Sequence, residues 1–138
     1  MISETLKLLL VEDDMLFTQL LQDLLAKQPS PQMEIVHAQQ LETALQHLAQ
    51  TKFDAVLADL GLPDSQGIET FLKLQHASPD MPIVVLTGSE DLELESNILQ
   101  AGAQDYLIKN PSDVRLVAKA VRLAVYRHRW QRPTQNPN

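Results

Sequence analysis

The sequence contains no cysteine and no long apolar run, and these two absences exclude several classes of protein. Without cysteine there is no disulfide framework, no thiolate metal site and no thiol nucleophile, which suits a reducing compartment. The first residues, MISETLKLLLVEDD, lack a basic segment followed by an apolar core of export length, and no run approaches the roughly 20 apolar residues that span a membrane. We therefore expect a cytoplasmic protein that does not bind membranes.

Acidic residues are absent from the last part of the chain. All 18 lie at or before Asp113, whereas six of the 11 lysines and arginines fall between Arg115 and Arg132. The net charge of −7 therefore combines an acidic body with a short basic tail. An acidic body argues against direct nucleic-acid binding, and we interpret the basic tail as a solvated helix face.

Proline and glycine do not occur inside any periodic segment. The eight prolines and four glycines lie between such segments and divide the chain into alternating units. Apolar runs predict five strands, at residues 7–11, 33–38, 55–60, 83–87 and 105–108. Apolar stripes with helical spacing predict five helices, through Phe17, Leu20, Leu21 and Leu24; Leu41, Ala44, Leu45 and Leu48; Ile68, Phe71 and Leu72; Leu94, Ile98 and Ala101; and Val114, Val117, Ala118, Val121 and Val125.

Five alternating strand and helix units in 138 residues predict one α/β domain, a five-stranded parallel sheet with five helices on both faces. Ligands of such folds bind at the carboxyl ends of the strands. The polar residues found there are Glu12, Asp13 and Asp14 after the first strand, Asp59 after the third, Thr87 after the fourth and Lys109 after the fifth. We expect these side chains to meet at one edge of the sheet.

Carboxylates gathered at this edge would repel one another unless a cation lay among them. Hard oxygen ligands favour Mg²⁺, which often binds phosphate oxygens as well. The pattern therefore indicates phosphoryl chemistry, with Asp59 as the candidate nucleophile and with Lys109 and Thr87 contacting phosphoryl oxygens. Backbone at Gly61 and Gly88 could approach closely because glycine has no Cβ atom.

Four segments, LLLVEDD, VLADLGLPDSQG, IVVLTGSE and GAQDYLIK, resemble in this order the receiver domain of bacterial two-component response regulators. The resemblance implies a (βα)5 flavodoxin-like receiver domain over residues 1–130, followed by a short polar tail at 131–138. It implies that a sensor histidine kinase or a histidine phosphotransfer protein passes a phosphoryl group to Asp59, with Mg²⁺, and that the receiver catalyses this transfer. A downstream protein target would then recognise a switched surface.

The resemblance also implies a metal site and a switch. Asp13 would bind the metal directly, Glu12 would act through water, and Asp59 and the carbonyl of Gly61 would supply further ligands. Thr87 and Lys109 would hold phosphoryl oxygens, and Tyr106 would turn inward when Thr87 moves.

Two features of the sequence leave the resemblance incomplete. VEDD offers two adjacent acids for one direct ligand, and we assign Asp14 to the N-terminus of the following helix. In many receivers a proline follows the lysine directly, whereas Asn110 here separates Lys109 from Pro111. The shape of the loop into the last helix therefore stays open.

Other classes of protein fit the sequence less well. An aspartyl phosphatase resembling haloacid dehalogenases needs a second aspartate two positions after the nucleophile, where Gly61 stands, and neither GxGxxG nor GxxxxGK[ST] occurs. The chain is therefore predicted not to be an enzyme but a stand-alone regulator. A receiver fragment of a longer regulator with a DNA-binding or enzymatic output, and a receiver-like scaffold that is not phosphorylated, remain alternatives. The four histidines lack metal-ligand spacing, and we expect them at the surface.

The last predicted helix has two apolar stripes. The valine-rich stripe is expected to face the sheet, which leaves Leu116, Ala120, Leu123 and Trp130 roughly opposite it. Basic residues flank this second stripe, and the preceding helix is acidic. We therefore expect a partner interface there, most simply a homodimer in which the basic rim of one copy meets the acidic helix of the other.

Overall fold

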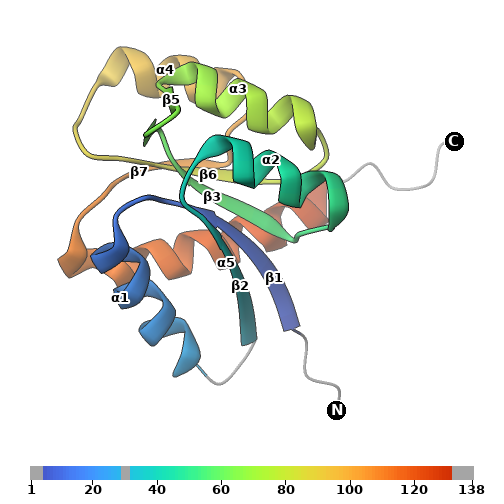
Figure 1. Cartoon of the computed structure of the whole chain (residues 1–138), viewed down its shortest axis with the longest axis vertical. Helices are drawn as coiled ribbons and strands as arrows, with labels where there is room; N and C mark the ends of the chain where they lie inside the picture. The colour runs from blue at the N-terminus through green and yellow to red at the C-terminus, as the bar shows by residue number, and fades with distance from the viewer. Residues whose placement is uncertain (1–4, 29–31, 132–138) are drawn as a thin grey trace, which may run out of the picture.

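The apolar runs form one parallel sheet in the computed structural model, which describes residues 5–28 and 32–131. Its strands are β1 (Thr5–Val11), β2 (Gln32–Ala38), β3 (Ala55–Asp59), β6 (Ile83–Thr87) and β7 (Asp105–Ile108). Their order across the sheet is β2-β1-β3-β6-β7, and every pair is parallel (Figure 1). The chain moves outward from β1 to β2 and then returns to place β3 on the other side of β1. The topological switch point therefore lies between β1 and β3.

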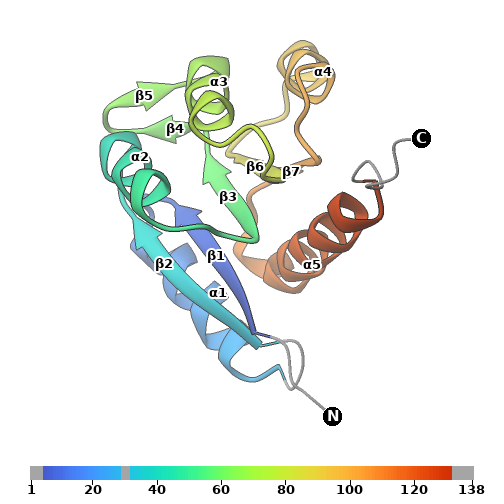
Figure 2. The ribbon, with the colours of Figure 1, turned by 90° about the vertical axis from the view of Figure 1, so that its right-hand side faces the viewer.

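Helices cover both faces of this sheet, as the alternation predicts (Figures 1 and 2). The helices are α1 (Met15–Ala26), α2 (Leu41–Gln50), α3 (Ile68–Ala77), α4 (Leu92–Gln100) and α5 (Val114–Gln131). α1 and α5 pack on one face, and α2, α3 and α4 pack on the other. Alternate residues of β1 serve the two cores, since Leu8 and Leu10 face α1 and α5 while Leu9 and Val11 face the other layer.

Two predicted helix stripes are rotated in the structure. Leu20 and Leu72, which the spacing places in the core, are exposed large apolar residues, whereas Leu25 and Leu74 are buried. Both helices carry more leucines than one face can bury, so packing against the sheet decides which of them point inward. The predicted positions of the helices are therefore confirmed, whereas the prediction that Leu20 and Leu72 face the core was wrong.

A short antiparallel hairpin, which was not predicted from the sequence, follows β3. β4 (Gly61–Leu62) pairs with β5 (Ser65–Gln66), and Gly67 with φ of 69° leads into α3. Asp64 lies in the turn of this hairpin and reaches the start of α2. Its two carboxylate oxygens accept the backbone N–H groups of Leu41 at 2.8 Å and of Glu42 at 3.0 Å. The hairpin is thereby attached to α2.

The segment between β7 and α5, whose shape the sequence left open, has a defined structure. The side chain of Asn110 accepts the backbone N–H of Ser112 at 2.9 Å and begins a 3₁₀ turn, η1 (Pro111–Asp113), with Pro111 in its first turn. This turn continues into α5 at Val114. Asn110 therefore takes the role of a capping residue between the site lysine and the last helix.

The C-terminal region differs from the prediction at two places. α5 includes Gln131, and the rest of the predicted tail, 132–138, lies outside the described residues. Ala120 was predicted in the exposed outer stripe of this helix, but it is only 6% exposed, so this assignment was wrong. In residues 5–28 and 32–131 no helix is both long enough and apolar enough to cross a membrane.

Candidate functional site

The acidic side chains at the end of β1 occupy different environments. Glu12 is fully buried, Asp13 is exposed, and Asp14 is half-buried. Asp14 is the N-cap of α1, as predicted, because its carboxylate accepts the backbone N–H of Phe17 at 3.1 Å. That bond, made to the charged form, holds the pKa of Asp14 below its usual range. Glu12 and Asp13 are therefore left to face the edge of the sheet.

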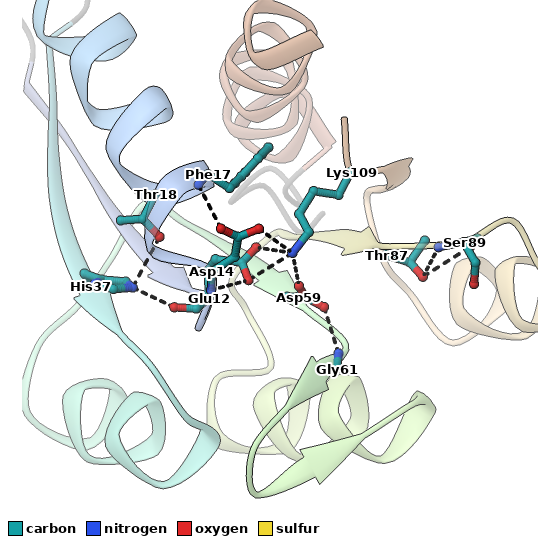
Figure 3. Close-up of polar contacts among 10 residues, drawn as sticks. All are labelled: Glu12, Asp14, Phe17, Thr18, His37, Asp59, Gly61, Thr87, Ser89 and Lys109. Carbon is teal, nitrogen blue, oxygen red and sulfur yellow. Dashed lines mark hydrogen bonds and ion pairs between the residues drawn. The ribbon is translucent and has the colours of Figure 1, made fainter. Parts of the chain in front are cut away.

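Lys109 joins the acids of β1 to the acid of β3 (Figure 3). Its Nζ atom lies 2.7 Å from Oδ2 of Asp59 and 3.1 Å from Oε1 of Glu12. It also lies 3.6 Å from Oδ2 of Asp14 and 5.8 Å from the centre of the Phe17 ring. Glu12, Asp59 and Lys109 stand at the carboxyl ends of three different strands, and the prediction that side chains from these ends meet is confirmed for these three.

Burial and mutual charge shift the protonation of this cluster. Burial, reinforced by the neighbouring carboxylate of Asp59, raises the pKa of Glu12 to about 8. Burial alone would favour a neutral lysine, but the contacts with Asp59 and Glu12 raise the pKa of Lys109 above its usual range. At neutral pH the site therefore holds a charged Lys109 ammonium beside a Glu12 carboxyl group that retains a proton.

The oxygen donors fit a divalent cation. Carboxylate oxygens of Glu12, Asp13 and Asp59 lie within 4.8 Å of one another, and they form the one such acidic group among residues 5–28 and 32–131. Hard oxygen donors of this kind, one of them solvent-exposed, suit Mg²⁺ with several bound waters. Gly61 is adjacent, since its N–H donates to Oδ1 of Asp59 at 2.7 Å. The predicted ligand residues therefore gather at one place.

Thr87 and Tyr106 lie on the neighbouring strands β6 and β7. The Thr87 hydroxyl donates to the carbonyl of Ser89 at 3.2 Å. The backbone carbonyl of Thr87 accepts the backbone N–H of Lys109 at 2.7 Å. Tyr106 is only 7% exposed, and its hydroxyl has no hydrogen-bond partner among the described residues. Burial accordingly raises the pKa of Tyr106. The ring is thus already turned inward in this structure, whereas Tyr106 was predicted to turn inward only when Thr87 moves.

Comparison with known proteins assigns the family. The sequence model described as response regulator receiver domain matches residues 8–121. The chain belongs to this family. The receiver domain is similar to the transcriptional regulatory protein CpxR of Escherichia coli K12, with 35% identity over 131 residues that cover 94% of this chain and 53% of CpxR. It is also 32% identical to the response regulator protein PilR of Pseudomonas aeruginosa, over 85% of this chain and 26% of PilR.

Solved structures agree with the receiver fold. The signal receiver domain of an HD domain-containing protein from Pseudomonas fluorescens Pf-5 superimposes with a TM-score of 0.80 at 27% identity, covering 93% of this chain and all of that one (100%). A CheY-like receiver domain protein from Methanospirillum hungatei JF-1 gives a TM-score of 0.78 at 25% identity, covering 93% and 99%. The chain spans about a quarter to about half of the length of PilR and CpxR. The likeness therefore concerns their receiver part.

Two side chains that contact segments next to the site were not predicted from the sequence. Asp64 anchors the hairpin that carries Gly61, and its signal was a carboxylate in the turn PDSQG, which is ordinary for turns. His37 was expected at the surface, but it is half-buried and its ring contacts the carbonyl of Glu12. Its signal was a polar residue that follows Met33 and Ile35 on the same face of a strand.

Proposed function

We propose that this receiver domain accepts a phosphoryl group on Asp59 from a phosphohistidine of a sensor histidine kinase or a histidine phosphotransfer protein. The observation that carries the proposal is the contact of Asp59 with Lys109 at 2.7 Å, beside the carboxylates of Glu12 and Asp13. In the transfer, an oxygen of Asp59 forms a bond to phosphorus while the bond between phosphorus and the donor imidazole breaks. The donor ring, which carries a proton on its other nitrogen, leaves as a neutral imidazole, and an acyl phosphate remains on the receiver.

The metal ligands in this proposal are Glu12, Asp13, Asp59 and the carbonyl of Gly61. A bound Mg²⁺ supplies positive charge that offsets the charge of the transferred group and of the acids. Glu12 and Asp13 hold this charge next to Asp59, and the fully buried Glu12 is kept in place by its contact with Lys109. Cation binding should therefore displace the proton that Glu12 retains.

The remaining residues orient the nucleophile and receive the phosphoryl oxygens. The N–H of Gly61 holds Oδ1 of Asp59 at 2.7 Å, so the carboxylate plane is fixed before the donor arrives. Lys109 already touches Asp59 and can turn to a phosphoryl oxygen, whose negative charge its ammonium would offset. The Thr87 hydroxyl can exchange the Ser89 carbonyl for another phosphoryl oxygen, which is the local event proposed for switching.

Labelling with acetyl phosphate tests the proposal. With Mg²⁺ the protein should gain one phosphoryl group, found at Asp59 by intact-mass spectrometry and peptide mapping, because Asp59 is the carboxylate that both Lys109 and the Gly61 N–H hold. The Asp59→Asn variant should remain unlabelled, and Asp54→Asn, which alters a half-buried aspartate near the other end of β3, is the matched control. Equal labelling of Asp59→Asn, or labelling that EDTA does not prevent, would contradict the assignment.

The receiver could act on its target in one of two ways. A stand-alone regulator, not itself an enzyme, would act by binding a downstream protein through a surface that changes on phosphorylation. The second candidate is the receiver part of a longer regulator, which the 53% coverage of CpxR, a transcriptional regulatory protein by name, favours. Sequencing the natural reading frame on both sides of these residues distinguishes the two. A receiver-like scaffold without phosphorylation is the outcome if acetyl phosphate fails to label Asp59.

The proposed partner surface is the outer face of α5. Leu116 is 57% exposed and Leu123 is 45% exposed, and Trp130 stacks on Tyr126 with ring centres 6.4 Å apart. We include Leu116 and Leu123 but exclude the buried Ala120. Exposed acids at the start of α4 supply opposite charge to the basic residues of α5, so a second copy of this receiver fits the surface.

A further inference from the structure

The carbonyl oxygen of Glu12 has an unusual partner for the end of a central strand. It lies 2.7 Å from Nε2 of His37, a side chain on the neighbouring edge strand β2 (Figure 3). The N–H of Glu12 donates to the carbonyl of Ala38 at 2.9 Å. Both backbone groups of this buried acid are therefore held by two consecutive residues of β2.

The chemistry of this contact determines the tautomer of His37. A carbonyl oxygen only accepts hydrogen bonds, so Nε2 must carry the hydrogen that His37 donates. The Thr18 hydroxyl, on a nearly fully buried residue of α1, lies 3.4 Å from the same Nε2 atom. The ring thus lies between β2, the end of β1 and α1. It contacts the backbone at Glu12, where the acidic segment of residues 12–14 begins.

The position of His37 in β2 explains how the ring reaches this corner. Met33 and Ile35 point from β2 toward the core under α1, and His37 is the next residue on that face. It lies near the carboxyl end of β2 and pairs with Leu10 of β1, two positions before Glu12. An apolar side chain here would fill the same space but could not donate to the Glu12 carbonyl.

We propose that His37 is a positioning residue of the receiver site, which holds the backbone of Glu12 so that Glu12 and Asp13 present their carboxylates to a divalent cation. The inference rests on the proposed function, because it concerns the same metal ligands. Glu12 has two attachments besides its backbone, the N–H of Asp14 at 3.1 Å and the ammonium of Lys109. Without the His37 bond, the loop from Glu12 to Asp14 would keep these attachments, but the carbonyl of Glu12 would no longer be held in place.

Cation affinity measures this role directly. Groups that hold metal ligands in place typically change metal affinity by about 10-fold or more when they are removed. We expect His37→Leu to bind Mg²⁺ about 10-fold more weakly than wild type by isothermal titration calorimetry. The variant His37→Gln should recover most of this loss, because its side-chain amide offers an N–H at a similar distance from the backbone. His47→Leu, which alters a half-buried histidine in α2, should bind like wild type.

The outcomes separate this inference from the proposed function and from a general loss of stability. If wild type does not bind Mg²⁺, the proposed function fails. If wild type binds and His37→Leu binds equally well, or if His37→Gln is as weak as His37→Leu, the positioning role is overturned. A fall in thermal stability with unchanged Mg²⁺ affinity would overturn it as well, since that result describes a residue that only supports the fold.

A measurement on the unaltered protein provides an independent test. Long-range proton–nitrogen correlation spectra of the imidazole rings should show the neutral His37 ring with its hydrogen on Nε2. They should do so without Mg²⁺ as well as with it, because the Glu12 carbonyl is part of the fold. A ring whose single hydrogen is on Nδ1 could not donate from Nε2 to the Glu12 carbonyl, and this result would overturn the proposal without any variant.

Discussion

The ammonium of Lys109 lies 3.1 Å and 3.2 Å from the two carboxylate oxygens of Glu12, a residue 97 positions earlier in the chain. The same ammonium contacts Asp59 at 2.7 Å. The Lys109 ammonium thus contacts acids at the ends of both β1 and β3, the two strands between which the topological switch point lies. This arrangement makes Lys109 important for phosphoryl transfer and unfavourable for metal binding, since two positive charges in one site repel each other.

That opposition predicts opposite effects of one substitution. Lys109→Met should bind Mg²⁺ more tightly than wild type, because a positive charge is removed from the cluster, while labelling by acetyl phosphate should slow about 100-fold, as for other lost transition-state donors. Calorimetry and time-resolved mass spectrometry measure the two quantities. Lys73→Met, which alters an exposed lysine on α3, should leave both unchanged. Weaker Mg²⁺ binding together with normal labelling would contradict the role given to Lys109.

Thr87 should couple the phosphoryl group to α4 and β7. Beryllofluoride, which imitates a phosphoryl group, should shift amide signals of residues 88–103 and of Tyr106 in wild type, since the hydroxyl must leave the Ser89 carbonyl. Thr87→Ala should still bind Mg²⁺ but lose most of these shifts, and Thr87→Ser should keep them. Because Tyr106 is already buried, its signal should report a change of neighbours and not the entry of an exposed ring. Full shifts in Thr87→Ala would remove support for the coupling.

Asp64 should stabilise the fold by capping α2 from the hairpin. Partial desolvation opposes ionisation, but the N–H groups of Glu42 and Leu41 hold the pKa of Asp64 below its usual range. Its contribution is therefore complete above the unfolded pKa, near 3.8, and is lost as the pH falls through the lower folded value. Asp64→Ala should reduce the free energy of unfolding by about 1 kcal/mol at pH 7.

Urea unfolding at several pH values measures this contribution. The difference between wild type and Asp64→Ala should shrink as the pH falls below about 4, where the Asp64 carboxylate of the unfolded chain binds a proton first and that of the folded protein follows at lower pH. Asp80→Ala, which alters an exposed aspartate after α3, is the control and should change stability little. A difference that persists undiminished at pH 2 would mean that charge on Asp64 does not carry the effect.

The outer face of α5 should mediate self-association. Sedimentation of wild type with beryllofluoride should show dimers at high micromolar concentration, because exposed Leu116 and Leu123 would be buried between copies. Leu116→Glu/Leu123→Glu should remain monomeric, and Leu72→Glu, on an exposed position of α3, should associate like wild type. A double variant that dimerises as well as wild type would exclude this face.

Local periodicity predicted most of the fold of this chain. The five strands and five helices lie where apolar runs and helical stripes indicate, because burial on two faces leaves continuous apolar segments in a parallel sheet. The hairpin of β4 and β5 was missed, since each of its strands has two residues and no period can be read from two positions. Ala120, Leu20 and Leu72 were placed on the wrong face because spacing alone tolerates a rotation of the helix.

The sequence by itself determined which chemical groups stand at the carboxyl ends of the strands, because strand ends and their polar residues are neighbours along the chain. Only the tertiary structure decided which of these groups touch. The order β2-β1-β3-β6-β7 places Asp59 beside the acids of β1 and lets Lys109 reach both. It also places His37 against the carbonyl of Glu12, 25 positions away, and Asp64 at the start of α2. Such contacts depend on strand order and side-chain direction, which packing of the two helical layers sets and which no local pattern records.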